Sequence, residues 1–123
     1  MNVLKKVLFV GLFLSIVNGC TTEPKTKILS ESERKQIYKE LIAASDRAYT
    51  DADRLYPLPK QNVLQAVGTE QFKKNSNTID ELREKYKSEV AKKYGITREQ
   101  REKINEEGDL KEWPMPPFKL NAN

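Results

Sequence analysis

The sequence predicts a small all-α protein of about four helices, two long and antiparallel and two short, with an extended proline-rich C-terminal strap. Apolar residues recur at spacings of three and four over two long stretches. A Ser or Thr followed three residues later by Glu or Gln, the capping box that opens helices, occurs at residues 30–33, 78–81 and 97–100. No strand-like alternation of four or more residues stands out.

The first predicted helix covers residues 31–55 and begins after the capping box at Ser30. Its apolar stripe has spacings of four, three, four, four and three residues and comprises Ile37, Leu41, Ala44, Ala48, Ala52 and Leu55. The small alanines in the middle of this stripe permit a close approach by another helix. Pro57 ends the helix, because a proline moves the preceding residue out of the helical conformation.

A connector and a short helix are predicted next. Residues 57–61 form the connector, and Asn62 can cap a short helix over residues 63–74. Gly68 weakens this helix. Residues 75–77, with the sequence Asn-Ser-Asn, have the composition of a turn.

The second long helix is predicted over residues 79–94, after the capping box at Thr78. Its apolar stripe comprises Ile79, Leu82, Tyr86 and Val90. Gly95 supplies a left-handed stop at its C-terminus. We expect this helix to be the antiparallel partner of the helix over residues 31–55.

A second short helix and the strap complete the predicted fold. This helix opens at Thr97, runs to about Glu107 and stops at Gly108. Residues 114–117 contain three prolines in four positions, which forbid helix and favour an extended or polyproline conformation. We expect a clasp in which the strap lays its apolar side chains over the helices. The alternative is a proline-rich ligand displayed to a partner.

The first twenty residues have the organisation of a signal sequence. Lys5 and Lys6 precede an apolar run over residues 7–17, which as a helix spans roughly 16 Å, about half of a bilayer core. This length is too short for a transmembrane helix and is typical of the apolar region of a signal peptide. The segment ends in Val17-Asn18-Gly19-Cys20 and resembles the lipobox of bacterial lipoproteins, with Asn18 in place of the usual small or aliphatic residue.

This resemblance implies cleavage before Cys20, a thioether-linked lipid on Cys20 and acylation of the new N-terminus by palmitate-type chains. Several acyl chains give stable membrane anchoring. We therefore expect the protein on a membrane of the cell envelope, facing outward from the cytoplasm. Thr21 stands where an aspartate would retain a lipoprotein at the inner membrane, so the outer membrane is favoured if the source has two. An ordinary cleaved signal peptide with an incidental cysteine is the alternative.

The expected organisation is a signal peptide (1–19), the lipidated cysteine with a flexible tether (20–29), one helical domain with its strap (30–118) and a short tail (119–123). Removing residues 1–19 leaves 104 of the 123 residues, enough for one small domain. The remaining part has 20 Lys and Arg against 18 Asp and Glu, interleaved along the chain. Such interleaving is typical of solvated helix surfaces and not of a nucleic-acid-binding patch.

The residue inventory argues against catalysis. The sequence has no histidine, and the lipobox resemblance implies that its single cysteine is lipidated, so we expect no Ser-His or Cys-His pair and no zinc site of the usual kind. Asp46, Asp51 and Asp53 crowd the end of the first helix but lack the glycine and the spacing of a calcium loop. We expect no enzymatic activity, no metal site and no cofactor.

Residues 90–104 resemble the helix-turn-helix pattern of DNA-binding proteins. Ala91, Gly95 and Ile104 fall where that motif has a small residue, the turn glycine and a core aliphatic residue. Arg101, however, occupies a position that the motif fills with an apolar residue, and the segment follows an export signal. We therefore expect a helix corner that binds no nucleic acid.

The expected function is that of an adaptor or accessory subunit that contacts an envelope protein without catalysis. The alternative is a binding module that holds a small ligand or peptide in a groove lined by Tyr and Trp. The candidate interaction surface comprises Tyr38, Tyr49, Trp113, Met115 and Phe118, because aromatic residues and methionine are enriched at interfaces.

Overall fold

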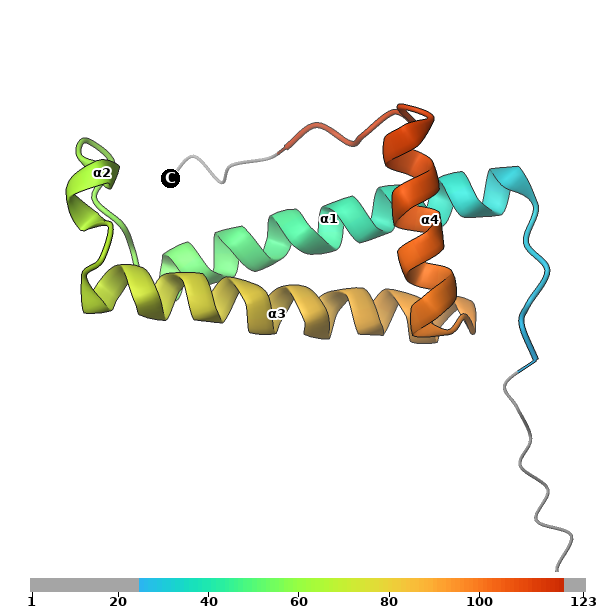
Figure 1. Ribbon diagram of the computed structural model, residues 1–123, viewed down its shortest axis with the longest axis horizontal. Coiled ribbons are helices and arrows are strands. Elements are labelled where there is room, and N and C mark those ends of the chain that lie inside the picture. Colours follow the sequence, from blue (N-terminus) through green and yellow to red (C-terminus); the bar gives the residue numbers. More distant parts are fainter. Residues whose placement is uncertain (1–24, 119–123) are drawn as a thin grey trace, which may run out of the picture.

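The computed structural model describes residues 25–118. This part of the chain forms four α-helices and no strand, which confirms the predicted all-α class with two long and two short helices: α1 (Glu31–Leu55), α2 (Val63–Ala66), α3 (Glu70–Tyr94) and α4 (Arg98–Leu110). α1 and α3 lie side by side in opposite directions (Figure 1). α4 crosses both at one end of the pair, and α2 lies at the other end. Among these helices, none is long and apolar enough to span a bilayer.

α1 begins and ends as predicted. The Ser30 hydroxyl accepts a hydrogen bond from the backbone N–H of Glu33, and the Glu33 carboxylate accepts one from the backbone N–H of Ser30. The predicted apolar stripe is buried from Ile37 to Ala52, and Leu41 has no exposed surface. Its last member, Leu55, is 57% exposed. The stripe therefore leaves the core before α1 ends.

The start of α3 differs from the prediction. α3 begins at Glu70, capped by the Thr69 hydroxyl, so the turn predicted over residues 75–77 is wrong and those residues are helical. The side chain of Asn75 is buried and donates a 2.9 Å hydrogen bond from its amide to the Tyr56 carbonyl, just beyond the end of α1. This long-range bond satisfies the polar group that made the segment look like a turn.

The short helix predicted over residues 63–74 is wrong in its extent. α2 is a single turn, and Asn62 makes no side-chain capping bond to it. Gly68 follows with a φ of 87°, in the left-handed region that glycine adopts readily. The glycine thus separates α2 from α3 and does not merely weaken one continuous helix.

The core lies mainly where α4 crosses the helix pair. Its larger cluster combines residues from three helices, the α3–α4 corner and the strap: Ile37, Tyr38, Leu41, Ala91, Ile96, Ile104 and Trp113. A smaller cluster of Ala44, Ala48 and Tyr86 continues between α1 and α3, where the alanines leave room for the tyrosine ring. Neither cluster includes a residue of α2.

The end of α4 also differs from the prediction, because the helix passes through Gly108 and continues to Leu110. A β-carbon at Gly108 would overlap the aromatic ring of Tyr38, so this glycine provides space and not a stop. The chain then turns at Glu112, which has a φ of 51°, and the Trp113 N–H donates to the Gly108 carbonyl at 2.9 Å. Gly108 thereby positions both Tyr38 and the beginning of the strap.

The corner between α3 and α4 forms at Gly95 with a φ of 64°, which confirms the predicted left-handed stop. Beyond it, the Arg101 side chain is 2% exposed although it carries a charge. Its guanidinium contacts Glu84 at 3.1 Å and Glu102 at 2.7 Å, and it donates to the Ser88 hydroxyl at 3.3 Å. Buried charges require such partners. Arg101 therefore joins α4 to α3 through an ion pair.

Candidate functional site: an apolar end and a groove

Two of the five predicted surface residues lie in the core. The rings of Tyr38 and Trp113 pack edge to face, with centroids 5.8 Å apart and an interplanar angle of 79°. The Tyr38 hydroxyl donates to an Asp109 carboxylate oxygen at 2.8 Å. Burial and this hydrogen bond to the carboxylate raise the pKa of Tyr38. Both rings are buried and have little surface to offer a partner.

The other three candidates are exposed, and two of them meet. Tyr49 on α1 and Phe118 at the end of the strap line one groove, whereas Met115 lies outside it. The strap therefore packs as the expected clasp at Trp113, while Met115 is open to solvent. Cys20, the predicted lipidation site, lies outside the described residues.

The groove runs between the C-terminal half of α1 and the N-terminal half of α3 and has a volume of about 570 Å³. Its lining combines apolar side chains with short polar ones and one residue of each charge: Tyr49, Thr50, Asp53, Arg54, Leu58, Phe72, Asn75, Ser76, Ile79 and Phe118. This size and mixture are typical of sites that bind apolar groups with a few orienting hydrogen bonds.

Neighbouring side chains hold the walls of the groove in place. The Arg83 guanidinium lies 5.2 Å from the centre of the Tyr49 ring and donates to the Tyr49 hydroxyl at 2.8 Å. On the facing wall, the hydrogen bond from Asn75 to the Tyr56 carbonyl links α3 to the chain after α1. Contacts within the chain thus hold both walls of the groove.

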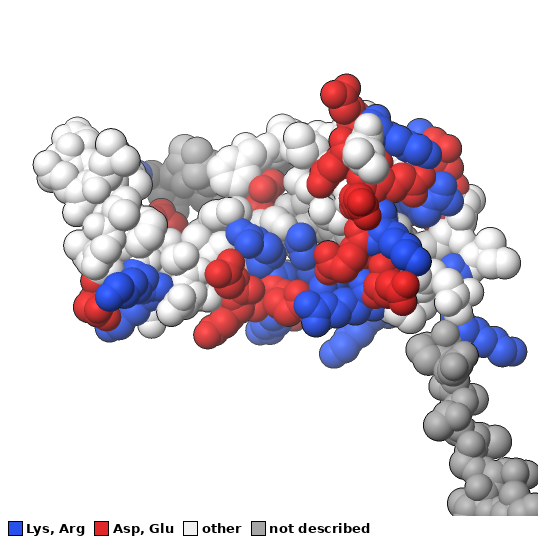
Figure 2. All heavy atoms as spheres, in the orientation of Figure 1, with Lys and Arg blue, Asp and Glu red and all other residues white. Residues whose placement is uncertain are grey.

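A second apolar surface, which was not predicted from the sequence, lies beside this groove. Four aliphatic side chains around α2 are exposed, and together we call them the apolar end: Leu55, Val63, Leu64 and Val67. Figure 2 shows the surface over α2 free of charged atoms, whereas acidic and basic side chains gather below it at the start of α3 and crowd α4 and the C-terminal part of α3. The low charge of this segment could have indicated the surface. Residues 55–69 contain one charged residue, Lys60, in a chain in which 33% of the residues are charged.

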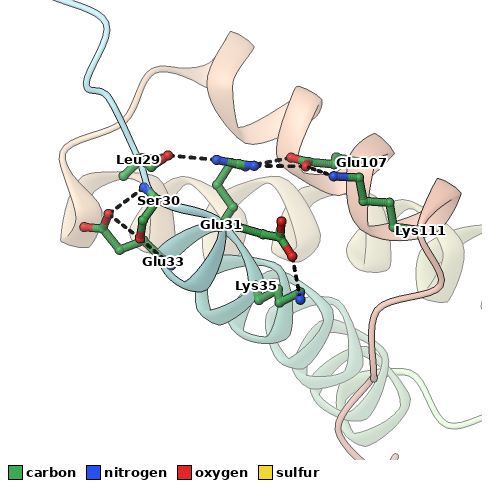
Figure 3. A network of polar contacts seen from close by, with 8 residues as sticks. Leu29, Ser30, Glu31, Glu33, Lys35, Glu107 and Lys111 are labelled. Atoms are coloured by element: carbon green, nitrogen blue, oxygen red, sulfur yellow. Dashed lines mark hydrogen bonds and ion pairs between the residues drawn. The ribbon is translucent and has the colours of Figure 1, made fainter.

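The opposite end is closed by ion pairs. Arg34 on α1 contacts Glu107 on α4 through two nitrogen–oxygen pairs of 2.7 and 3.1 Å and donates to the Leu29 carbonyl at 2.7 Å (Figure 3). Lys111 contacts the same carboxylate at 2.7 Å. Hydrogen bonds from Arg34 and then Lys111 lower the pKa of Glu107 to about 2. These contacts fasten the start of α1 to the end of α4.

The segment before α1 is also held at this end. The Lys27 ammonium donates to the Tyr94 carbonyl at 3.3 Å, and the Gln100 side chain donates to the Lys27 carbonyl at 2.7 Å. Residues 27–29, which we assigned to the flexible tether, therefore lie against the α3–α4 corner. The described chain thus enters the domain beside α4, far from α2 (Figure 1).

Two of the three aspartates near the end of α1, Asp51 and Asp53, are engaged by neighbouring protein groups. Asp51 accepts a hydrogen bond from the Tyr86 hydroxyl at 2.7 Å and pairs with Arg54 at 3.4 Å. Asp53 accepts from the backbone N–H of Leu58 at 3.3 Å. Within residues 25–118, no group of three or more His, Cys, Asp or Glu side chains is placed to hold a metal ion.

The chain matches no protein-family model, no curated protein and no solved structure. The apolar end and the groove are two apolar surfaces that the described residues leave accessible. Both lie at the end of the domain away from α4.

Proposed function

We propose that this protein is a small lipid-anchored envelope lipoprotein that acts as an adaptor or accessory subunit through non-catalytic protein contacts. The observation that carries the proposal is the position of the apolar end. Leu55, Val63, Leu64 and Val67 are exposed together at the side of the domain opposite the segment that leads back to Cys20.

The length of α1 separates these two sides. Its 25 residues span about 37 Å at the usual helical rise. Acyl chains on Cys20 hold the α4 end, where residues 25–30 enter, toward the membrane. The apolar end then faces away from the lipid surface, where a second envelope protein can reach it. Anchoring both proteins at one membrane raises their effective concentration for each other.

The chemistry of the apolar end favours a protein partner. Contiguous exposed aliphatic side chains on a soluble domain mark interaction sites, and the centres of protein interfaces are depleted in charge. Leu64 is 89% exposed and lies in a stretch whose one charge is Lys60. Binding of a partner with a complementary apolar surface is favourable, because it removes these side chains from water.

The test is in vivo crosslinking of the wild-type protein and two matched variants. We expect one dominant envelope protein to be recovered with the wild type and with Leu110→Asp, whose side chain is exposed on α4. Leu64→Asp should reduce this product roughly tenfold or more, because it places a charge in the interface. Recovery of no partner, or an undiminished product with Leu64→Asp, contradicts the proposal.

Anchoring is tested separately by Cys20→Ala, which should leave an unprocessed or soluble form. The mature wild-type protein should carry the mass of its lipid in the membrane fraction. Detection of unmodified Cys20 in mature native protein outside the membrane contradicts the lipoprotein assignment.

The groove supports a second candidate, a binding module for a small ligand or peptide. Its volume of about 570 Å³ and its aromatic residues Tyr49, Phe72 and Phe118 suit an apolar group. Trp113 and Tyr38 take no part in it, since both are buried in the core. Binding of a ligand that Phe72→Ala abolishes, without loss of the crosslinked partner, favours this candidate.

A further inference from the structure

The strap is attached to the domain firmly at one point and weakly at another. Trp113 is buried in the larger core cluster, and its backbone N–H is bonded to Gly108. Five residues further on, Phe118 lies in the lining of the groove with 49% of its surface exposed. The strap therefore begins in the core and ends in the groove.

Between these points the strap has few ties to the helices. Three of the residues 114–117 are prolines and lack a backbone N–H, and no hydrogen bond joins the described residues 114–118 to α1 or α3. A cavity of about 660 Å³ separates Pro116 and Pro117 from the α1 residues Ala43, Asp46, Arg47, Thr50 and Asp51. Met115 is exposed. Phe118 can consequently leave the groove without breaking hydrogen bonds or the packing of Trp113.

We propose that residues 114–118 form a displaceable lid, in which Phe118 covers one side of the groove. The partner protein inserts an extended segment with an aromatic or large aliphatic anchor residue into the groove. This anchor residue takes the position that Phe118 leaves. This inference rests on the proposed function for the existence of a protein partner. The lid itself depends only on the contacts of the strap and the groove.

The chemistry of the groove explains this choice of occupant. Tyr49, Phe72 and Ile79 offer an apolar floor for a large side chain, and Asn75 and Ser76 offer polar atoms beside it. The strap itself indicates which kind of peptide can bind in the groove, namely an extended proline-rich segment that ends in an aromatic residue. Such segments lose little conformational entropy on binding. Attachment at Trp113 gives Phe118 a high effective concentration, so a partner's anchor must compete with it.

The experiment measures binding of a fluorescein-labelled synthetic peptide with the sequence of residues 114–120, PMPPFKL, to the full chain. Phe118→Ala should bind the peptide about tenfold or more tightly than the wild type, because the side chain that competes for one side of the groove is removed. Met115→Ala is the matched control and should bind like the wild type, since Met115 is exposed outside the groove. Phe118→Ala combined with Phe72→Ala should lose the peptide.

Equal affinity for the wild type and Phe118→Ala, no binding to Phe118→Ala, or retained binding in the double variant overturns the lid. A dimer in sedimentation experiments that Phe118→Ala abolishes also overturns it, because the groove is then filled by the strap of a second copy. The peptide measurement involves no envelope partner. Its failure is therefore distinguishable from loss of the crosslinked product, which tests the adaptor proposal.

Discussion

The two ends of the helix pair are built in opposite ways. At the α4 end, a third helix and Trp113 cover α1, and the ion pairs Arg34–Glu107 and Arg101–Glu84 fasten the layers together. At the α2 end, Leu55 and Leu64 are exposed, and α2 is a single turn. α1 carries the same apolar stripe toward both ends.

The difference shows that an apolar stripe is buried only where another element reaches it. Leu41 and Leu55 belong to one stripe, yet the first is fully buried and the second is 57% exposed. α4 is 13 residues long and crosses the pair at one end, so it covers only part of the 25 residues of α1. Stability is thus concentrated at the α4 end, while the uncovered apolar surface is available for binding at the α2 end.

The largest expected effect comes from removing the ring that closes the α4 end. Trp113→Ala should lower the free energy of unfolding by about 3–5 kcal/mol, because it leaves a cavity beside Tyr38 and Ile37. Urea denaturation followed by circular dichroism measures the change. Phe118→Ala is the control at the other end of the strap and should stay within about 1 kcal/mol of the wild type. Equal losses for the two variants would contradict the difference between the ends.

A smaller effect is expected from adding one methyl group at the crossing of α4 and α1. Gly108→Ala should destabilise the protein by about 1–3 kcal/mol, because the new β-carbon overlaps the Tyr38 ring. Helix propensity acts in the opposite direction, since alanine is favoured over glycine in a helix by about 1 kcal/mol. In a Tyr38→Leu background the penalty of Gly108→Ala should shrink or reverse, as thermal denaturation of the four variants will show. An unchanged penalty would mean that the overlap is not its cause.

The smallest expected effect is the pH dependence of the Arg34–Glu107 contact. Folding lowers the pKa of Glu107 to about 2, so its contribution to stability is present above the unfolded pKa of about 4.3. This contribution is lost as the pH falls from about 5 toward 2, and should be on the order of 1 kcal/mol for a partly exposed pair. Urea midpoints measured over this range should show a shallower slope for Glu107→Gln than for the wild type. Equal slopes would assign the acid sensitivity to other carboxylates.

Most elements specified by short-range chemistry were predicted correctly, although Thr78, whose capping box was predicted to open the second long helix, lies inside α3. Ser30 and Thr97 act within three residues of the helix starts that they cap, and Gly95 adopts the left-handed conformation that ends α3. The spacing of the α1 stripe fixed the buried side of that helix from Ile37 to Ala52. Each of these features depends on residues that are close together in the chain, so it can be predicted from the sequence pattern.

Features that depend on distant partners were predicted poorly. Asn75 has the composition of a turn residue, but its bond to the Tyr56 carbonyl keeps it inside α3. Gly108 has the composition of a helix stop, but the ring of Tyr38 requires its missing side chain. The apolar end was missed for the same reason, and Tyr38 and Trp113 were wrongly expected at an accessible surface, because exposure depends on which elements lie above a residue.

The sequence by itself determined the all-α class, the caps of α1 and α4, the Gly95 corner and the apolar side of α1, since each follows from hydrogen bonds and periodicity within a few residues. Only the tertiary structure decided that Trp113 and Arg101 lie in the core, that Phe118 lines a groove and that α2 leaves its aliphatic side chains exposed. Those outcomes depend on the crossing of α4 over one end of the helix pair, and a crossing is set by packing between residues far apart in the chain.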